Sequence, residues 1–66
     1  MEEMTFITDA NGILHNESGP AVIHSDGYQA WYLNGLRHRV GGPAVVYPEA
    51  KLEAYYLNGV NQNTEI

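Results

Sequence analysis

The chain has 66 residues, no cysteine and a formal net charge of −5 at pH 7. This length supports one small domain, and the lack of cysteine excludes disulfide bridges and cysteine-based zinc sites. Because nucleic acid and anionic membranes both need a basic surface, the charge argues against direct binding to either.

The acidic excess lies in the N-terminal half. Residues 1–36 contain no lysine or arginine, and all three basic residues lie further along the chain. The acidic start differs from a secretory signal, and no apolar run is long enough to cross a bilayer, so we expect a complete, cytoplasmic protein. Acidity alone keeps small proteins soluble, although it also suits a basic protein partner.

The first predicted hairpin joins strands at residues 22–23 and 28–33. Both segments are rich in β-branched or aromatic residues and are bounded by turn signals. Asp26-Gly27 lies between them, and an Asp-Gly pair favours a two-residue type I′ turn. That turn would place Ile23 opposite Ala30.

A second hairpin is predicted from strands at residues 45–47 and 52–57. Here Pro48-Glu49-Ala50 replaces the tight Asp-Gly turn. The stretch from 6 to 16 matches only the closing half of such a unit. We therefore expect an incomplete copy at the N-terminus and a worn copy at the C-terminus, both of which would serve as caps.

Two sequence blocks recur in the same order. Residues 19–22 return as 42–45, an offset of 23, and residues 31–35 return in similar form as 55–59, an offset of 24. Such spacing is typical of a tandem repeat, which builds a shape more readily than a catalytic pocket. The single repeat domain, 1–66, then divides into a degenerate half unit at about 5–18 and units at 19–41 and 42–63.

The expected fold is all-β: a single twisted antiparallel meander of five or six short strands built from tandem β-hairpin repeats. The predicted register divides the side chains between two faces. One face would carry Val22, Trp31, Leu33, Val45, Tyr55 and Leu57; the other would carry Ile23, Ala30, Tyr32, Val46, Ala54 and Tyr56. A sheet of this size covers one face at most, so we expect the second, tyrosine-rich face to be partly open.

Residues 34–45, Asn-Gly-Leu-Arg-His-Arg-Val-Gly-Gly-Pro-Ala-Val, resemble the variant MORN-type repeat. Its units read roughly aromatic-Asn-Gly, then His-Arg, then Gly-Pro-Ala, and the resemblance covers about residues 10–60. It implies a β-hairpin array without catalytic residues, of the kind found in small phage and bacterial proteins. Asn16 and Gln62-Asn63 depart from the His-Arg pattern, so only His38 and Arg39, with His15 in part, match it.

The three histidines, His15, His24 and His38, are the strongest candidates for catalysis or metal binding. No carboxylate lies at a diagnostic spacing beside them, and His15 and His38 occupy equivalent repeat positions. A repeated structural role, such as bonding a loop carbonyl, is therefore the favoured interpretation. The sequence predicts no enzyme, no metal site and no cofactor.

Six residues are predicted to bind a partner. The tyrosines Tyr28, Tyr32 and Tyr56 would supply contact area, and Asp9, Glu17 and Asp26 would steer association. The favoured hypothesis is a non-enzymatic acidic inhibitor that docks on a basic, nucleic-acid-binding surface of a host defence nucleoprotein, as many anti-CRISPR proteins do. The alternative is a self-associating structural module, such as a homodimer, because two and a half units fall short of the three that arrays usually need.

Overall fold

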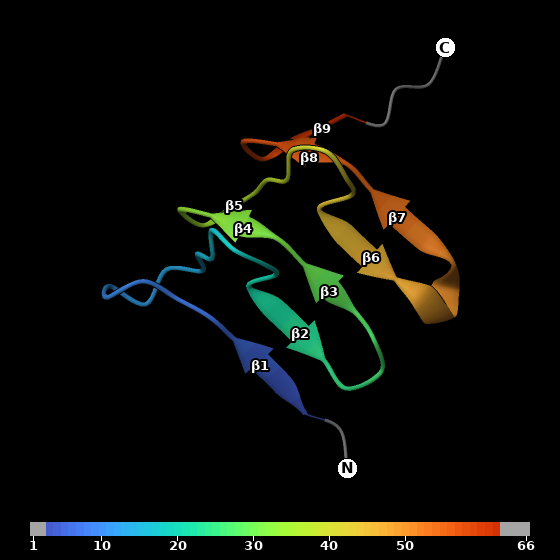
Figure 1. Cartoon of the computed structure of the whole chain (residues 1–66), viewed down its shortest axis with the longest axis horizontal. Helices are drawn as coiled ribbons and strands as arrows, with labels where there is room; N and C mark the ends of the chain where they lie inside the picture. Colours follow the sequence, from blue (N-terminus) through green and yellow to red (C-terminus); the bar gives the residue numbers. More distant parts are fainter. Residues whose placement is uncertain (1–2, 63–66) are drawn as a thin grey trace.

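The computed structural model describes residues 3–62, and within them it forms a five-stranded antiparallel sheet with two separate two-stranded sheets. The main sheet has the order β1-β2-β3-β6-β7 (Figure 1). Its strands are β1 (Met4–Phe6), β2 (Val22–His24), β3 (Gln29–Ala30), β6 (Val45–Tyr47) and β7 (Leu52–Ala54). The expected all-β antiparallel fold is confirmed, with one short 3-10 turn, η1 (Pro48–Ala50), between β6 and β7.

The two small sheets are tight hairpins that leave the main sheet after β3 and β7. The first pairs β4 (Tyr32–Leu33) with β5 (Leu36–Arg37), and the second pairs β8 (Tyr56–Leu57) with β9 (Val60–Asn61). In each, an Asn-Gly pair has positive φ at both residues, 54° and 80° in the first and 50° and 82° in the second. These values define type I′ turns, for which Asn-Gly is the favoured sequence.

The predicted long strands over 28–33 and 52–57 are each interrupted. The N–H of Trp31 donates to the carbonyl of Ala44, whereas its carbonyl accepts the N–H of His38. Because the N–H and the carbonyl of this one residue bond to different strands, the chain leaves the main sheet at Trp31 and enters the small hairpin. The sequence pattern did not reveal this change of partner, so the two small sheets were not predicted.

The predicted turn at Asp26-Gly27 is wrong by one residue. Val22 pairs with Ala30 and Ile23 with Gln29, which leaves a three-residue loop instead of two. Only Gly27 in this loop has positive φ, at 101°. Such a loop is the type I turn followed by a left-handed residue, the second common hairpin geometry.

The predicted faces of the sheet are also wrong. A register shift of one residue moves every side chain of a strand to the other face. Val22 and Val45 do not share a face with Trp31; they pair with Ala30 from either side, and the three form the buried cluster. Leu14, Tyr28, Tyr32, Ala54 and Tyr56 pack against this cluster. The predicted open tyrosine-rich face is therefore the covered one.

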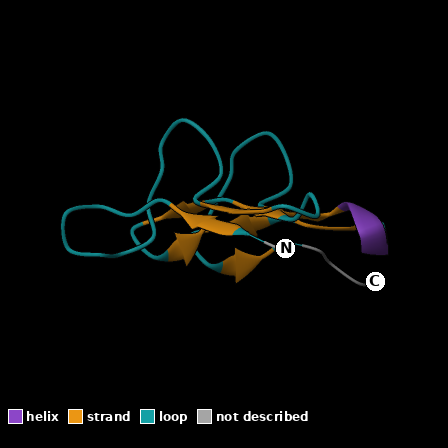
Figure 2. Ribbon diagram, turned by 90° about the horizontal axis from the view of Figure 1, so that it is seen from below, coloured by secondary structure: helices purple, strands orange, loops and turns teal. Residues whose placement is uncertain are grey.

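The sheet is a thin slab that measures 39 × 28 × 15 Å, with loops rising from one side of it (Figure 2). Its buried hydrophobic residues are few and small, namely Ala21, Val22, Ala30, Ala44 and Val45. No helix in residues 3–62 has the length and apolar character that a membrane crossing requires.

Two of the histidines each accept a hydrogen bond from the backbone of the next Asn-Gly turn along the chain. His15 Nδ1 accepts the N–H of Asn34, and His38 Nδ1 accepts the N–H of Asn58, both at 2.9 Å. The partner is thus a backbone amide, not the loop carbonyl that the sequence suggested. Since Nδ1 is the acceptor, each neutral ring carries its hydrogen on Nε2.

We predict that His38→Ala lowers the free energy of unfolding by about 0.5–1.5 kcal/mol, because the Asn58 N–H loses its acceptor. His15→Ala should cost a similar amount, since its bond has the same length and exposure. Urea denaturation followed by tryptophan fluorescence would measure both. Two variants as stable as the parent protein would show that these bonds do not stabilise the turns.

Candidate functional site

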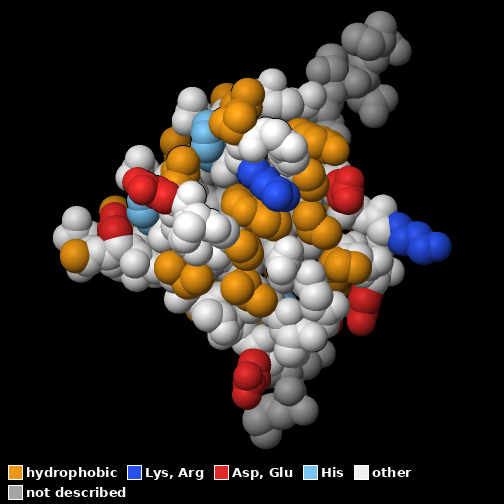
Figure 3. All heavy atoms as spheres, in the orientation of Figure 1, with side chains coloured by type: hydrophobic (Ala, Val, Ile, Leu, Met, Phe, Trp, Pro, Cys, Tyr) orange, Lys and Arg blue, Asp and Glu red, His pale blue; other side chains and the backbone are white. Residues whose placement is uncertain are grey.

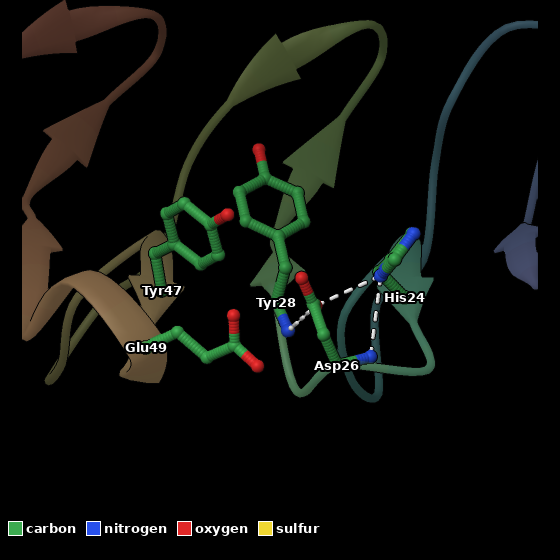
Figure 4. A pocket seen from close by; sticks show the side chains of 5 residues that line it. All are labelled: His24, Asp26, Tyr28, Tyr47 and Glu49. Atoms are coloured by element: carbon green, nitrogen blue, oxygen red, sulfur yellow. Dashed lines mark hydrogen bonds and ion pairs between the residues drawn. The ribbon is translucent and has the colours of Figure 1, made fainter. Parts of the chain in front are cut away.

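A shallow pocket of about 430 Å³ opens where the loop between β2 and β3 meets the end of β6. It is lined by His24, Asp26, Tyr28, Tyr47 and Glu49 (Figure 4). β3 lies between β2 and β6, and its register with β6 places Tyr28 beside Tyr47. Two of the six predicted partner-binding residues, Asp26 and Tyr28, meet here.

The two tyrosine rings form one wall. Tyr28 and Tyr47 lie edge to face, with ring centroids 5.6 Å apart and an interplanar angle of 88°. Such a pair sets the edge of one ring against the face of the other, and both side chains are half-buried. The negative face of a tyrosine ring attracts a cation.

Asp26 is fixed by its own loop. Its Oδ1 accepts the N–H of Tyr28 at 3.0 Å and lies 2.8 Å from His24 Nδ1. The N–H of Asp26 also lies 3.2 Å from His24 Nδ1. One ring nitrogen cannot donate to the carboxylate and accept from the amide at once, and the shorter contact favours a hydrogen on Nδ1.

These contacts keep Asp26 ionised. The hydrogen bond from the Tyr28 N–H is the main reason that the pKa of the Asp26 carboxyl lies below its ordinary value, and the hydrogen bond from His24 acts in the same direction. The side chains of His24 and Asp26 are only 15% and 21% exposed. With Glu49 on the opposite rim, the pocket presents two carboxylates and two aromatic rings.

The other predicted tyrosines serve the fold. Arg37 Nε donates to the Tyr32 hydroxyl at 3.2 Å, and its Nη1 donates to the Tyr56 hydroxyl at 3.3 Å. The guanidinium carbon also lies 6.0 Å and 5.3 Å from the two ring centroids. Arg37 therefore joins the two small hairpins, and the structure separates Tyr32 and Tyr56 from the pocket that contains Tyr28.

The remaining predicted acidic residues lie apart from the pocket. Asp9 Oδ1 accepts the N–H groups of Asn11 and Ile13, so it closes the first Asn-Gly turn where no earlier histidine does so. The Glu17 side chain is 83% exposed and lies 3.5 Å from His15 Nε2. Only Glu17 of this pair has the exposure that steering requires.

Sequence reasoning missed His24, Tyr47 and Glu49 as pocket residues. Residues 24 and 47 are equivalent in the two units, 23 positions apart. With the three-residue loop, that equivalence would have placed Tyr47 on the same face of the sheet as Tyr28. The two-residue turn concealed the relationship.

Arg39, the other residue that matches the His-Arg pattern, binds within the chain. Its guanidinium carbon lies 4.0 Å from the centre of the Trp31 ring, and its Nη1 donates to the Pro43 carbonyl at 3.1 Å. No group of three or more metal-ligating side chains occurs in the part of the chain that the structure describes. The last residue of the predicted second unit, Asn63, lies outside the described residues.

Comparison with known protein families, curated proteins and solved structures found no match to this chain. The resemblance to a MORN-type repeat thus stays a prediction from the sequence.

We predict that Asp26→Asn lowers stability at neutral pH and that the difference from the parent protein shrinks in acid. Because the folded pKa lies below the unfolded value of 3.8, the contribution of Asp26 is complete above that pH and is lost as the pH falls through the folded pKa. Urea denaturation from pH 6 to about pH 2 would measure it. Glu17→Gln, which removes an equally charged but exposed group, should show a smaller change; equal behaviour of the two variants would contradict the assignment.

We predict that Arg37→Met raises the pKa of Tyr56 toward its ordinary value of 10.0. The hydrogen bond with Asn61 is the largest cause of the lowered pKa, and the bond from Arg37 is the next, so part of the shift should remain. Methionine keeps most of the packing of the arginine stem but neither hydrogen bond. Ultraviolet titration of tyrosine would follow the change. An unaltered titration curve would argue against the hydrogen bond from Arg37 to the Tyr56 hydroxyl.

Proposed function

We propose that this protein is a non-enzymatic binding module that holds a cationic side chain of a protein partner in the pocket of Asp26, Tyr28, Tyr47 and Glu49. The observation that carries the proposal is the combination of an edge-to-face tyrosine pair with a carboxylate that its own loop keeps ionised. A lysine or arginine side chain matches that chemistry, because carboxylates pair with its charge and aromatic faces attract it.

The overall charge distribution supports a basic partner. The net charge of −5 would accelerate association with a positive surface and would make it sensitive to salt. Figure 3 shows one face of the molecule, where hydrophobic side chains gather around a basic side chain over the middle of the sheet and acidic side chains lie nearer the rim. An apolar centre with a charged rim is the usual arrangement of a protein-binding surface.

Self-association is the second candidate, because the thin sheet leaves large apolar side chains uncovered. Phe6 is 58% exposed, Val60 is 61% and Val40 is 79%. End-to-end stacking is less favoured, since Asp9 closes the first turn and Gln62 Nε2 bonds the Val60 carbonyl at the last. A concentration series in sedimentation equilibrium separates the candidates: a monomer at high concentration removes self-association.

The narrower hypothesis of a cytoplasmic phage-type inhibitor of a host defence nucleoprotein rests on the sequence resemblance and on the acidic charge. It remains a prediction that binding to a basic nucleic-acid-binding surface would support. The pocket supplies the chemistry that such a surface needs, a site for an exposed lysine or arginine.

The direct test uses acetylated, amidated Gly-Arg-Gly and Gly-Lys-Gly peptides as probes of the pocket. We expect saturable amide shifts at residues 24–29 and at Tyr47 and Glu49, with a dissociation constant on the order of millimolar, because a single cationic group contributes little more than that. The double variant Asp26→Asn/Glu49→Gln should weaken binding by about tenfold.

Glu53→Gln and Glu17→Gln together are the matched control, because they remove the same charge outside the pocket. The control should bind the probes nearly as well as the parent protein. Equal weakening by both double variants would mean that net charge attracts the probes, and the absence of saturable shifts would refute the pocket.

A further inference from the structure

The main sheet ends at β7, and within residues 3–62 no strand lies on its outer side. The carbonyl of Ala54 accepts the N–H of Ala44 at 2.8 Å and therefore faces inward, toward β6. Polar groups of successive residues in a strand point to opposite sides. The N–H and carbonyl of Glu53 consequently point outward, where a further strand would bond them.

Two equivalent edges inside the protein show which kind of strand such an edge holds. The side of β1 that is equivalent to the outer edge of β7 pairs with β2, and the equivalent side of β3 pairs with β6. Both added strands follow a Gly-Pro-Ala segment. The registers are equivalent: Phe6 pairs with Val22 and Thr5 with Ile23, as Ala30 pairs with Val45 and Gln29 with Val46.

The backbone hydrogen bonds that connect β2 to β1 and β6 to β3 are also equivalent. The N–H of Ile7 donates to the Ala21 carbonyl at 2.8 Å, and the N–H of Trp31 donates to the Ala44 carbonyl at 2.7 Å. In both cases the acceptor belongs to the alanine of Gly-Pro-Ala, and that alanine is 0% exposed. Pairing of this kind therefore favours a small residue at the position of Ala21 and Ala44.

The side chains near β7 repeat the environment of β3. Tyr55 occupies the position of Trp31 and is 42% exposed; Leu57 is 40% exposed. Together with Arg39, Val40, Gly41, Gly42 and Gln62 they line a second, mainly apolar groove of about 430 Å³. In the equivalent position of the first unit, the guanidinium of Arg39 covers the Trp31 ring.

We propose that the outer edge of β7 and this groove bind an extended segment of a partner protein with the pattern Arg-x-x-x-Pro-Ala-Val. The valine would lie opposite Ala54, and the arginine would cover Tyr55 as Arg39 covers Trp31. The partner thereby adds a sixth strand to the sheet by β-augmentation. This site is separate from the pocket of Asp26 and Tyr28, so the inference does not depend on the proposed function.

Charges at the edge refine the specificity. Lys51 and Glu53 protect the exposed strand against indiscriminate pairing, a common device at sheet edges. In the added strand, the residue after the valine would lie opposite Glu53, as Val46 lies opposite Gln29. A lysine there would pair with Glu53, because cross-strand residues of opposite charge attract.

The test uses a peptide with the sequence of residues 38–47 of this chain, titrated into the isotope-labelled protein. We expect saturable amide shifts concentrated at residues 52–57. In the peptide, Val45→Asp should weaken binding by about tenfold or more, because it places a charge beside the covered face. Val46→Lys should strengthen binding at low salt, and added salt should remove that gain.

Two protein variants provide a matched pair. Glu53→Pro removes an outward N–H without breaking a bond to β6, and Phe6→Pro makes the same change at the opposite edge of the sheet. Glu53→Pro should abolish peptide binding and Phe6→Pro should leave it intact, with amide spectra verifying that both variants fold. Shifts spread over both edges, equal binding by the Val45→Asp peptide, or unchanged binding to Glu53→Pro would each overturn the proposal.

Discussion

Backbone hydrogen bonds that pass from the end of one hairpin to the Gly-Pro-Ala segment of the next hold this sheet together. The N–H of Ile7 reaches Ala21, and the N–H of Trp31 reaches Ala44. A slab 15 Å thick, in which residues 3–62 include five buried hydrophobic residues, has little core to contribute. A small domain of this kind depends on continuous strand pairing more than on apolar burial. The histidine bonds to Asn34 and Asn58 extend the same principle to the turns.

The candidate pocket is a consequence of this pairing between units. Tyr28 and Asp26 belong to the first unit, whereas Tyr47 and Glu49 belong to the second, and they meet because β3 pairs with β6. The pocket would disappear if the units separated, although each hairpin remained intact. Binding to the pocket should therefore also stabilise the sheet, since a ligand that binds only the folded state shifts the folding equilibrium.

The sequence predicted the features that depend on local chemistry, since the β-branched and aromatic segments formed strands. The type I′ turns at residues 34–35 and 58–59 also follow local chemistry, because Asn-Gly pairs favour this geometry. Prediction failed where the N–H and the carbonyl of one residue bond to two different strands, as at Trp31, because nothing in the pattern of side chains reports the direction of a backbone bond. It also failed at Asp26-Gly27, where the same dipeptide suits two turn types and the contacts of His24 and Tyr28 accompany the longer one.

Two strand registers decided how much of the site could be predicted. Asp26 and Tyr28 were identified for their charge and interface chemistry, but the β3–β6 register that brings Tyr47 beside Tyr28 was not predicted. The predicted two-residue turn made the tyrosine-rich face the open one, whereas Tyr32 and Tyr56 pack on the buried cluster and bind Arg37. Arg37 itself carried no signal in the sequence, because its role depends on the distance between two hairpins.

Cross-strand contacts between backbone protons test the account most directly, because they report the register of the main sheet without reference to side chains. Nuclear Overhauser effects should connect Val22 with Ala30 and Ala30 with Val45, the pairs on which the buried row and the pocket depend. Contacts that connect Ile23 with Ala30 and Ala30 with Val46 instead would show a two-residue turn and a β3–β6 pairing shifted by one residue. They would exchange the two faces and separate Tyr28 from Tyr47, and the pocket would not exist.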